Sequence, residues 1–464
     1  MHIRKYDLNF GRRELLKGIA CGAGTGVLMP IEKVMAKDMP LTNAYPDELY
    51  SIEDQTKGKI SVGDYITKAN VEDAKHILDP SMYDQIKNAG RRIKIKAPTT
   101  DMRKLFNHAY YEAMQRNIAE GRTAKFNADG NVVDAQGNPW GGGVPFISPK
   151  TGVEVWANMA MSWGRADANT YAIKQWDFGA DGKLEYQYDF QWVELQMQAR
   201  TDRKVFRGYD KELRRQTVYF SNSADVRGTS FLSNWSVDQR QIPDLYGYLP
   251  EFRRVRQFPA NQRFEPLIPG ATWFLTDPWA AGDPFLTWGN HKIIERKPML
   301  IACSGNFSGT DDNWKPKEQE VGNPIFWESE YEMAPDIIVT ECEPVGFPRS
   351  PVSKKRVYVD ARNSVPCGCV RYDRQGKLWA NFEMAFGQFV GGGKDGKRVV
   401  MSADGKTPAW SWTYVMIYDH QNKRLSRTHH AKKGVGTESL FQIDEDWLFE
   451  TYCTQQALQS LGRA

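Results

Sequence analysis

Few residues in this chain have the types and spacing of a catalytic or metal-binding site. The densest group is His429-His430, with His420 and Asp419 nearby in the sequence, which could offer imidazole and carboxylate ligands to a metal ion. Lys432 and Lys433 lie beside the pair and favour a solvated loop instead. The chain has no Gly-x-Ser-x-Gly elbow, no His-Glu-x-x-His pair and no Cys-x-x-Cys-His haem site. We therefore predict no metal site, no cofactor and no catalytic residue.

Two glycine-rich loops are further candidates for ion binding. Residues 391–397 could cradle a phosphate, but no helix follows them to add backbone N–H groups, so we interpret the loop as a hairpin connection. Residues 126–131 resemble a calcium loop, yet Val132 stands where that loop requires glycine. Neither loop predicts a bound ion.

Apolar and aromatic side chains recur at every second position in three stretches. After residue 183 the even positions are apolar or aromatic and the odd positions are polar, which is typical of a half-buried antiparallel strand. The three rows are Leu184, Tyr186, Tyr188, Phe190 and Trp192; Leu378, Ala380, Phe382, Met384 and Phe386; and Trp410, Trp412, Tyr414, Met416 and Tyr418. We expect each row to share one face of a sheet.

An aromatic face of this kind could form the wall of a cavity for a hydrophobic ligand. The candidate wall consists of Tyr186, Tyr188, Phe190, Trp192, Phe382, Met384, Phe386, Trp410, Trp412, Tyr414 and Met416. The same residues could instead be the packed core between the sheet and its helices, which is the commoner role for each of them alone, and the sequence leaves both possibilities open.

Each row adjoins a reverse turn of one design, at residues 176–184, 372–378 and 418–425. An aromatic residue ends the incoming strand, an aspartate can accept a backbone N–H two residues on, and Gly or Asn tolerates a positive φ. These turns predict three β-hairpins that belong to one sheet.

Helices and a long insertion complete the expected fold. An apolar stripe predicts that the longest helix runs from Thr100 or Asp101 through Glu120, as a packing partner for the sheet. Residues 239–299 lose the alternation and gain prolines and aromatics, so we expect a loop-rich insertion that folds back over an apolar surface. The C-terminal segment 445–462 is expected to be helical.

The first 36 residues predict a targeting segment. Arg12-Arg13 opens a twin-arginine signature, a weakly apolar run follows, and Ala36 ends a small-residue cleavage site. The apolar run before Cys21 is too short for a lipoprotein signal, so we expect no lipid anchor there. An ordinary cytoplasmic N-terminal arm with a chance pair of arginines is the alternative. We expect a protein exported to the periplasm by the twin-arginine route.

Charge argues against nucleic acid as a partner. The first 36 residues hold six of the 61 basic and three of the 57 acidic residues, which leaves 55 basic and 54 acidic residues after them. A net charge of +1 over that length gives no electrostatic footprint for nucleic acid. With 12% aromatic and 25% charged residues the composition is globular. We divide the chain into a signal peptide at 1–36, an extended lead-in at 37–64 and one large domain at 65–464.

Several phrases together resemble one family. These are Gly143-Val144-Pro145-Phe146 with Pro149-Lys150-Thr151-Gly152, the Arg253-Arg254-Val255-Arg256 run, and Arg356-Val357-Tyr358-Val359-Asp360 leading to the turn at 372–378. The chain resembles the domain of unknown function 1329 family of exported Gram-negative proteins, which are similar to the outer-membrane lipoprotein-sorting proteins LolA and LolB. Ile147-Ser148 and Cys367-Gly368-Cys369 depart from the family pattern.

The resemblance carries expectations about fold and partners. It implies a mainly antiparallel α+β fold, a strongly curved sheet or incomplete barrel, with helices across the concave face and a hydrophobic cavity between. It also implies, as partners, an outer-membrane channel-like protein and a resistance-nodulation-division exporter. No catalytic residue comes with the family.

Three functions remain open at this point. The first is a periplasmic binding or carrier protein for a hydrophobic small molecule or lipid. The second is a periplasmic enzyme with an unidentified cofactor, because the twin-arginine route often exports proteins that fold around one. The third is an adaptor subunit of an export complex.

Overall fold

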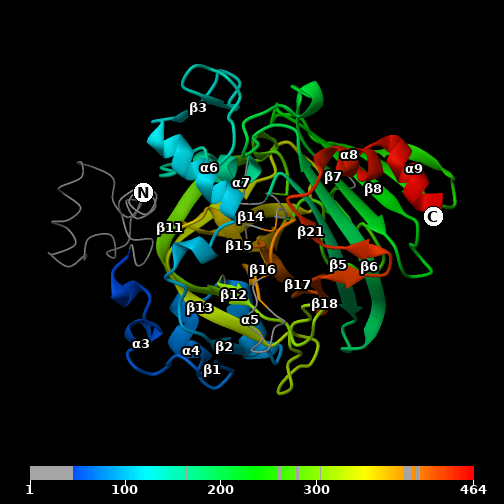
Figure 1. Cartoon of the computed structure of the whole chain (residues 1–464). Coiled ribbons are helices and arrows are strands. Elements are labelled where there is room, and N and C mark those ends of the chain that lie inside the picture. Colours follow the sequence, from blue (N-terminus) through cyan, green and yellow to red (C-terminus); the bar gives the residue numbers. More distant parts are fainter. Residues whose placement is uncertain are drawn as a thin grey trace.

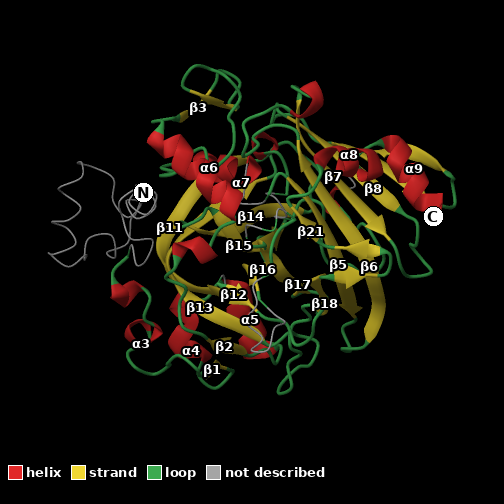
Figure 2. Ribbon diagram, in the orientation of Figure 1, coloured by secondary structure: helices red, strands yellow, loops and turns green. Residues whose placement is uncertain are grey.

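The computed structural model describes residues 45–161, 166–259, 263–277, 282–303, 305–390, 400–403, 405 and 408–463 (Figure 1). The expected leader residues Arg12, Arg13, Cys21 and Ala36 lie outside these ranges, as does the glycine-rich loop 391–397. Strands dominate the described part, and short helices pack against them (Figure 2).

Most strands belong to one antiparallel ladder. In spatial order it runs β10-β9-β8-β7-β6-β5-β18-β17-β16-β15-β14-β13-β11. The bounds are β5 Ala168–Phe178, β6 Leu184–Gln196, β7 Glu212–Phe220, β8 Ser230–Ser236, β9 Asp244–Leu249, β10 Arg254–Phe258, β11 Gly289–Ala302, β13 Ser329–Glu343, β14 Val352–Asp360, β15 Val365–Asp373, β16 Leu378–Phe389, β17 Trp410–Asp419 and β18 Arg424–Ala431.

Short strands extend this sheet. Here β2 (Ile93–Ile95) pairs parallel with β13, β12 (Asn306–Phe307) pairs parallel with β16, and β1 (Tyr65–Ile66) and β21 (Leu440–Phe441) add antiparallel edges. Among the described strands no pairing joins β10 to β11, so the sheet is open. The predicted α+β class with a mostly antiparallel sheet is confirmed.

The three predicted hairpins are confirmed. They join β5 to β6, β15 to β16 and β17 to β18. Asp181, Asp373 and Asp419 accept backbone N–H groups of their own turns at 2.9 to 3.0 Å. The positive φ falls on Gly182 and Gly376 as expected, but in the third turn it falls on Lys423 rather than on an asparagine.

The prediction that each aromatic row shares one face holds for Tyr186 to Trp192 of β6, but it is wrong for Leu184, which pairs with Phe178 beyond a register shift, and for β16 and β17. We call inner face the side of the sheet that carries Phe190, Phe382 and Trp412, and outer face the opposite side. In β17 the residue opposite Phe386 is Trp412 and the residue opposite Ala385 is Tyr414, so Thr413 is an extra residue. Such a β-bulge reverses the alternation.

Tyr414 and Met416 therefore lie on the outer face, away from Trp410 and Trp412. A second register shift, between Arg371 and Tyr372 of β15, places an extra residue at Trp379 of β16. Leu378 then packs on the outer face. Trp379, expected opposite the aromatic row, packs against the inner core.

Helices cover both faces. On the outer face α4 (Val71–Ala74) and α5 (Pro80–Asn88) share a core with β16, β17 and β18. The C-terminal helices α8 (Glu445–Tyr452) and α9 (Gln455–Arg463) pack on β6 and β8, as Figure 1 shows in red. The inner face is covered by α7 (Gly152–Met161) and by the insertion, whose Trp273, Phe285 and Trp288 join the inner core. The expectation that the insertion folds over an apolar surface is confirmed.

The longest predicted helix is divided. A short 3-10 turn at Met102–Lys104 precedes α6 (His108–Ala119), because the Asn107 side chain accepts the Tyr110 N–H at 3.3 Å and starts a new helix there. Strands also enter the stretch that was expected to be loop-rich, since β9, β10 and the start of β11 fall within 239–299. No helix in the described ranges is both long and apolar enough to span a bilayer.

A buried ion pair joins the outer-face helices to the sheet. The Arg91 guanidinium donates to Glu383 Oε1 of β16 and to Ser329 Oγ of β13, each at 2.8 Å, and both charged side chains are almost wholly buried. Burial of an unpaired charge is costly.

We predict that Glu383→Ala lowers the free energy of unfolding by about 3 to 5 kcal/mol, because it leaves the Arg91 guanidinium buried without its carboxylate. Glu330→Ala is the matched control, since the Lys96–Glu330 pair is about four-tenths exposed on each side. It should cost less than about 1 kcal/mol. Urea unfolding measures both, and equal costs would contradict this account of Glu383.

Candidate functional site

A cleft of about 420 Å³ opens where the three hairpins meet the insertion. Tyr186 comes just after the first turn, Trp379 just after the second, and Asp419 begins the third. Insertion residues 266–274 form the opposite wall. The volume lies in the range of ordinary small-molecule sites.

Aromatic rings form the apolar part of this cleft. Phe274 and Trp379 meet edge to face with ring centroids 5.6 Å apart, and the half-buried Tyr186 stacks on Tyr188 at 6.0 Å. Gly270 has a φ of +79°, and a Cβ there would lie 2.3 Å from the Tyr186 ring, so the chain can follow this path only with glycine.

The polar rim of the cleft is internally paired. Arg424 donates to Glu185, and Asp419 accepts from Asn422 Nδ2 at 2.8 Å and from Trp379 Nε1 at 3.3 Å. These pairings hold the rim in one geometry, and they present both charges and aromatic edges to a ligand.

Arg371 connects the cleft to the insertion. Its Nη1 donates to both carboxylate oxygens of Asp277, at 3.1 and 2.9 Å, and its Nη2 donates to the Thr272 carbonyl at 2.8 Å. The guanidinium also lies 4.1 Å from the Phe274 ring centroid. Charge pairing and ring contact therefore fix residues 272–277 against β15.

We call residues 263–277 and 282–288 the plug, because they cover the inner face. Thr272 N–H donates to Ser426 Oγ at 2.9 Å, Thr272 Oγ1 to the Ile417 carbonyl at 2.9 Å, and Trp273 Nε1 to Gln175 Oε1 at 3.0 Å. From the sheet, Tyr188 donates to the Pro269 carbonyl at 2.9 Å and Lys355 to the Thr276 carbonyl at 2.5 Å. Within the plug, Arg263 and Trp288 both donate to Asp283. The plug thus combines an apolar underside with specific polar attachments.

The candidate wall residues divide into three groups. Tyr186 lines the cleft. Tyr414 and Met416 lie on the outer face. The rest are buried on the inner face, in the core that includes the plug and α7: Tyr188, Phe190, Trp192, Phe382, Met384, Phe386, Trp410 and Trp412. Neither Trp379 nor Arg371 was expected to line a cleft, because the bulge that turns Trp379 inward leaves no signal in the alternation.

The histidines considered as metal ligands do not come together. His430 stacks on Trp412 at 4.9 Å in the inner core, whereas His429 stacks on Trp176 at 5.6 Å beside the outer core. Burial lowers the pKa of His429 to about 4 and that of His430 to about 3, so both are neutral at pH 7. Within the described ranges no three His, Cys, Asp or Glu side chains are grouped to hold a metal ion.

His420 belongs to a different group, in which a serine, a histidine and an aspartate are hydrogen-bonded in the same sequence as in a catalytic triad. Ser81 Oγ lies 2.6 Å from His420 Nε2, and His420 Nδ1 lies 2.7 Å from Asp84 Oδ2. Ser81 is wholly buried, however, and its Oγ also accepts from Gln85 Nε2 at 2.9 Å. A substrate carbonyl cannot reach Ser81 in this conformation, so the group links α5 to the third hairpin rather than forming an open active site.

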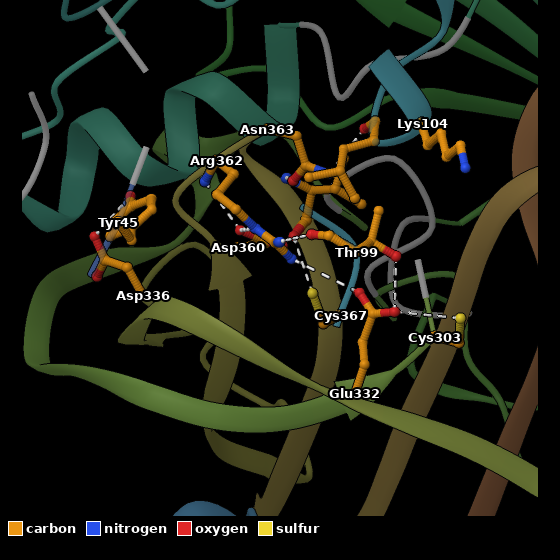
Figure 3. Close-up of polar contacts among 12 residues, drawn as sticks. Tyr45, Thr99, Lys104, Cys303, Glu332, Asp336, Asp360, Arg362, Asn363 and Cys367 are labelled. Carbon is orange, nitrogen blue, oxygen red and sulfur yellow. Dashed lines mark hydrogen bonds and ion pairs between the residues drawn. The ribbon is translucent and has the colours of Figure 1, made fainter. Parts of the chain in front are cut away.

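A second buried polar cluster anchors the N-terminal segment (Figure 3). Arg362 pairs with Asp360 and donates to the Thr99 carbonyl at 2.8 Å, while Thr99 Oγ1 and the Cys303 thiol both donate to Glu332. Burial raises the pKa of the Cys303 thiol, so it stays protonated at neutral pH.

The sealed Ser81 group gives a direct prediction. A fluorophosphonate probe should leave Ser81 unlabelled in the folded protein, and labelling would contradict its role as a structural link. Ser81→Ala should lower the free energy of unfolding by about 1 to 3 kcal/mol, because His420 and Gln85 lose a buried partner. Ser61→Ala, at an exposed position, is the control and should change it by less than about 0.5 kcal/mol.

Comparison with known proteins places the chain in a family without an assigned function. A DUF1329 family protein from Desulfovibrio piger is similar in structure, with a TM-score of 0.43 and 12% identity over 66% of this chain and 97% of that one. A LolA superfamily protein from Nitrosomonas europaea gives a TM-score of 0.36 and 12% identity over 65% and 98%. No curated protein matches the chain. The model of the family described as "protein of unknown function (DUF1329)" matches residues 65–459, and the chain belongs to this family.

Proposed function

We propose that the protein is an exported, periplasmic binding or carrier protein for a hydrophobic or amphipathic ligand such as a lipid. The observation that carries the proposal is the cleft of about 420 Å³, in which aromatic walls meet a paired polar rim. An acyl chain gains about 25 cal/mol for each Å² of apolar surface that it buries in such a site.

The cleft adjoins a larger apolar surface. Tyr186 lines the cleft and continues into the row Tyr188, Phe190 and Trp192 beneath the plug. In our proposal the inner face is the concave side of a curved sheet, and the ligand enters at the cleft and extends along this row when the plug moves. Tyr414 and Met416 are left out of the binding surface because they lie on the outer face.

Ligand binding tests the proposal directly. The exported protein is purified without detergent, extracted and examined by mass spectrometry, and it is titrated with a fluorescent fatty acid analogue. Trp379→Ala should weaken binding of the analogue by about tenfold or more, because truncating a central aromatic wall costs more than about 1.4 kcal/mol.

Trp447→Ala is the matched control for this titration. Trp447 is 44% exposed on α8, away from the cleft, so its loss should leave the affinity unchanged. A protein that carries no lipid and does not bind the analogue would exclude the carrier function. Equal loss of affinity in both variants would exclude the cleft as the site.

Export by the twin-arginine route is part of the proposal and has its own test. Replacing Arg12 and Arg13 together by lysine should keep the protein in the cytoplasm with its leader uncleaved, because the route reads the arginine pair. Replacing Arg4 and Lys5, which are also basic but lie outside the pair, should leave export unchanged. Cell fractionation and immunoblotting measure both, and normal export of the double-lysine variant would refute the route.

A further inference from the structure

One wall of the cleft is also the cover of the inner face. Pro266, Gly270, Thr272 and Phe274 line the cleft, while Ile268 and Trp273 of the same segment are buried in the inner core. We call residues 263–277 the gate. An outward movement of the gate would therefore widen the cleft and at the same time expose the aromatic row of β6.

Two hydrogen-bond chains run from the gate to a single carboxyl group. The Thr272 N–H donates to Ser426 Oγ at 2.9 Å, and Ser426 donates to Asp177 Oδ1. The Trp273 indole N–H donates to Gln175 Oε1 at 3.0 Å, and Gln175 Nε2 donates to both oxygens of Asp177 at 2.9 Å. Adjacent gate residues are thus tied to the sheet through the two partners of Asp177.

Asp177 differs from three buried aspartates of the sheet and the plug. Asp277 is paired with Arg371, Asp283 with Arg263, and Asp189 with Lys174. Asp177 is wholly buried and has no ion-pair partner among the described side chains. A carboxylate in that position has lost its hydration and gained no cation in exchange.

The charged and titratable groups that face Asp177 do not offset the free-energy cost of burying its carboxylate. The positive charge of Arg424 favours the ionised form of Asp177. Arg424 is bonded to Glu185, however, and the negative charge of Glu185 disfavours that form. Tyr188 lies nearby on β6 and is neutral at pH 7. The hydrogen bonds that Ser426 and Gln175 donate also favour the carboxylate, but burial is the dominant effect and raises the pKa of Asp177 to about 7.

We propose that Asp177 is the latch of the gate: its neutral carboxyl group holds residues 263–277 closed over the cleft, and loss of its proton to water releases them. This inference rests on the proposed function, because it assigns the regulation of the same cleft. When the gate moves away, the carboxylate regains water, so ionisation and opening favour each other.

The sign and size of the effect follow from linkage. In the closed state the pKa of Asp177 is about 7, and in an open, hydrated state it should be near the ordinary value of about 3.9. The closed form therefore holds more protons between these values. The opening equilibrium constant should rise by about tenfold for each pH unit from about pH 4 to about pH 7, and level off above that.

Hydrogen exchange followed by mass spectrometry tests the latch on the full-length protein without ligand. Exchange of peptides within 263–277 is measured from pH 5 to pH 8 and divided by the intrinsic rate at each pH. The corrected exchange should rise by about 50-fold from pH 5 to pH 7, because the tenfold slope per pH unit lessens as the pH reaches the pKa of the closed state. Peptides of β16 should show no such rise.

Asp177→Asn is the matching variant, because it keeps the size of the side chain and removes the titration. In this variant the gate should stay closed at every pH. Asp189→Asn is the control, since Asp189 is equally buried but paired with Lys174 at 2.8 Å, and it should keep the wild-type pH dependence in the gate.

Three results would contradict the role of Asp177 as the latch. A flat wild-type profile overturns the latch even if Asp177→Asn fails to fold, and so does a rise shared by β16, which would report global unfolding. A wild-type slope that persists in Asp177→Asn also overturns it. Because no ligand is present, a pH-dependent gate combined with an absence of lipid binding would uphold the latch and refute the carrier.

Discussion

The ion pair between Arg371 and Asp277 determines how the inner face is closed. Both groups are almost completely buried, and neither would be stable there without the other. Because Arg371 also donates to the Thr272 carbonyl and contacts Phe274, it sets the path of the insertion over several residues in the closed arrangement. The plug covers the aromatic face, and the cleft is the space left between the plug and the hairpin turns.

The fold was predictable where the information is local. Turn residues near Gly182 and Gly376 predicted the hairpins, and strict alternation predicted the row from Tyr186 to Trp192. Alternation misled wherever an extra residue entered a strand. The bulges at Trp379 and Thr413 depend on the register of the neighbouring strand, which a single row of residues does not encode. The helix expected from residue 100 was divided for a local reason, the side chain of Asn107.

The candidate site was less predictable because its contacts are remote in sequence. Ser81 and His420 are 339 positions apart, and Arg371 meets Asp277 across 94. Aromatic composition indicated an apolar surface and an insertion that folds back over one, but only the tertiary structure shows which strands and which insertion residues meet there. The same long-range contacts give His420 a neighbourhood that resembles an active site and is closed to substrate.

The position of the three turns has a consequence for the evolution of the family. The rim of the cleft is built from residues in or next to short surface connections, whereas the sheet beneath is buried. Surface turns tolerate insertions and deletions far better than strands do. Lengthening one hairpin by a few residues would change the depth and polarity of the cleft and leave the core untouched. In such a family, differences in hairpin length would therefore change which molecules fit the cleft.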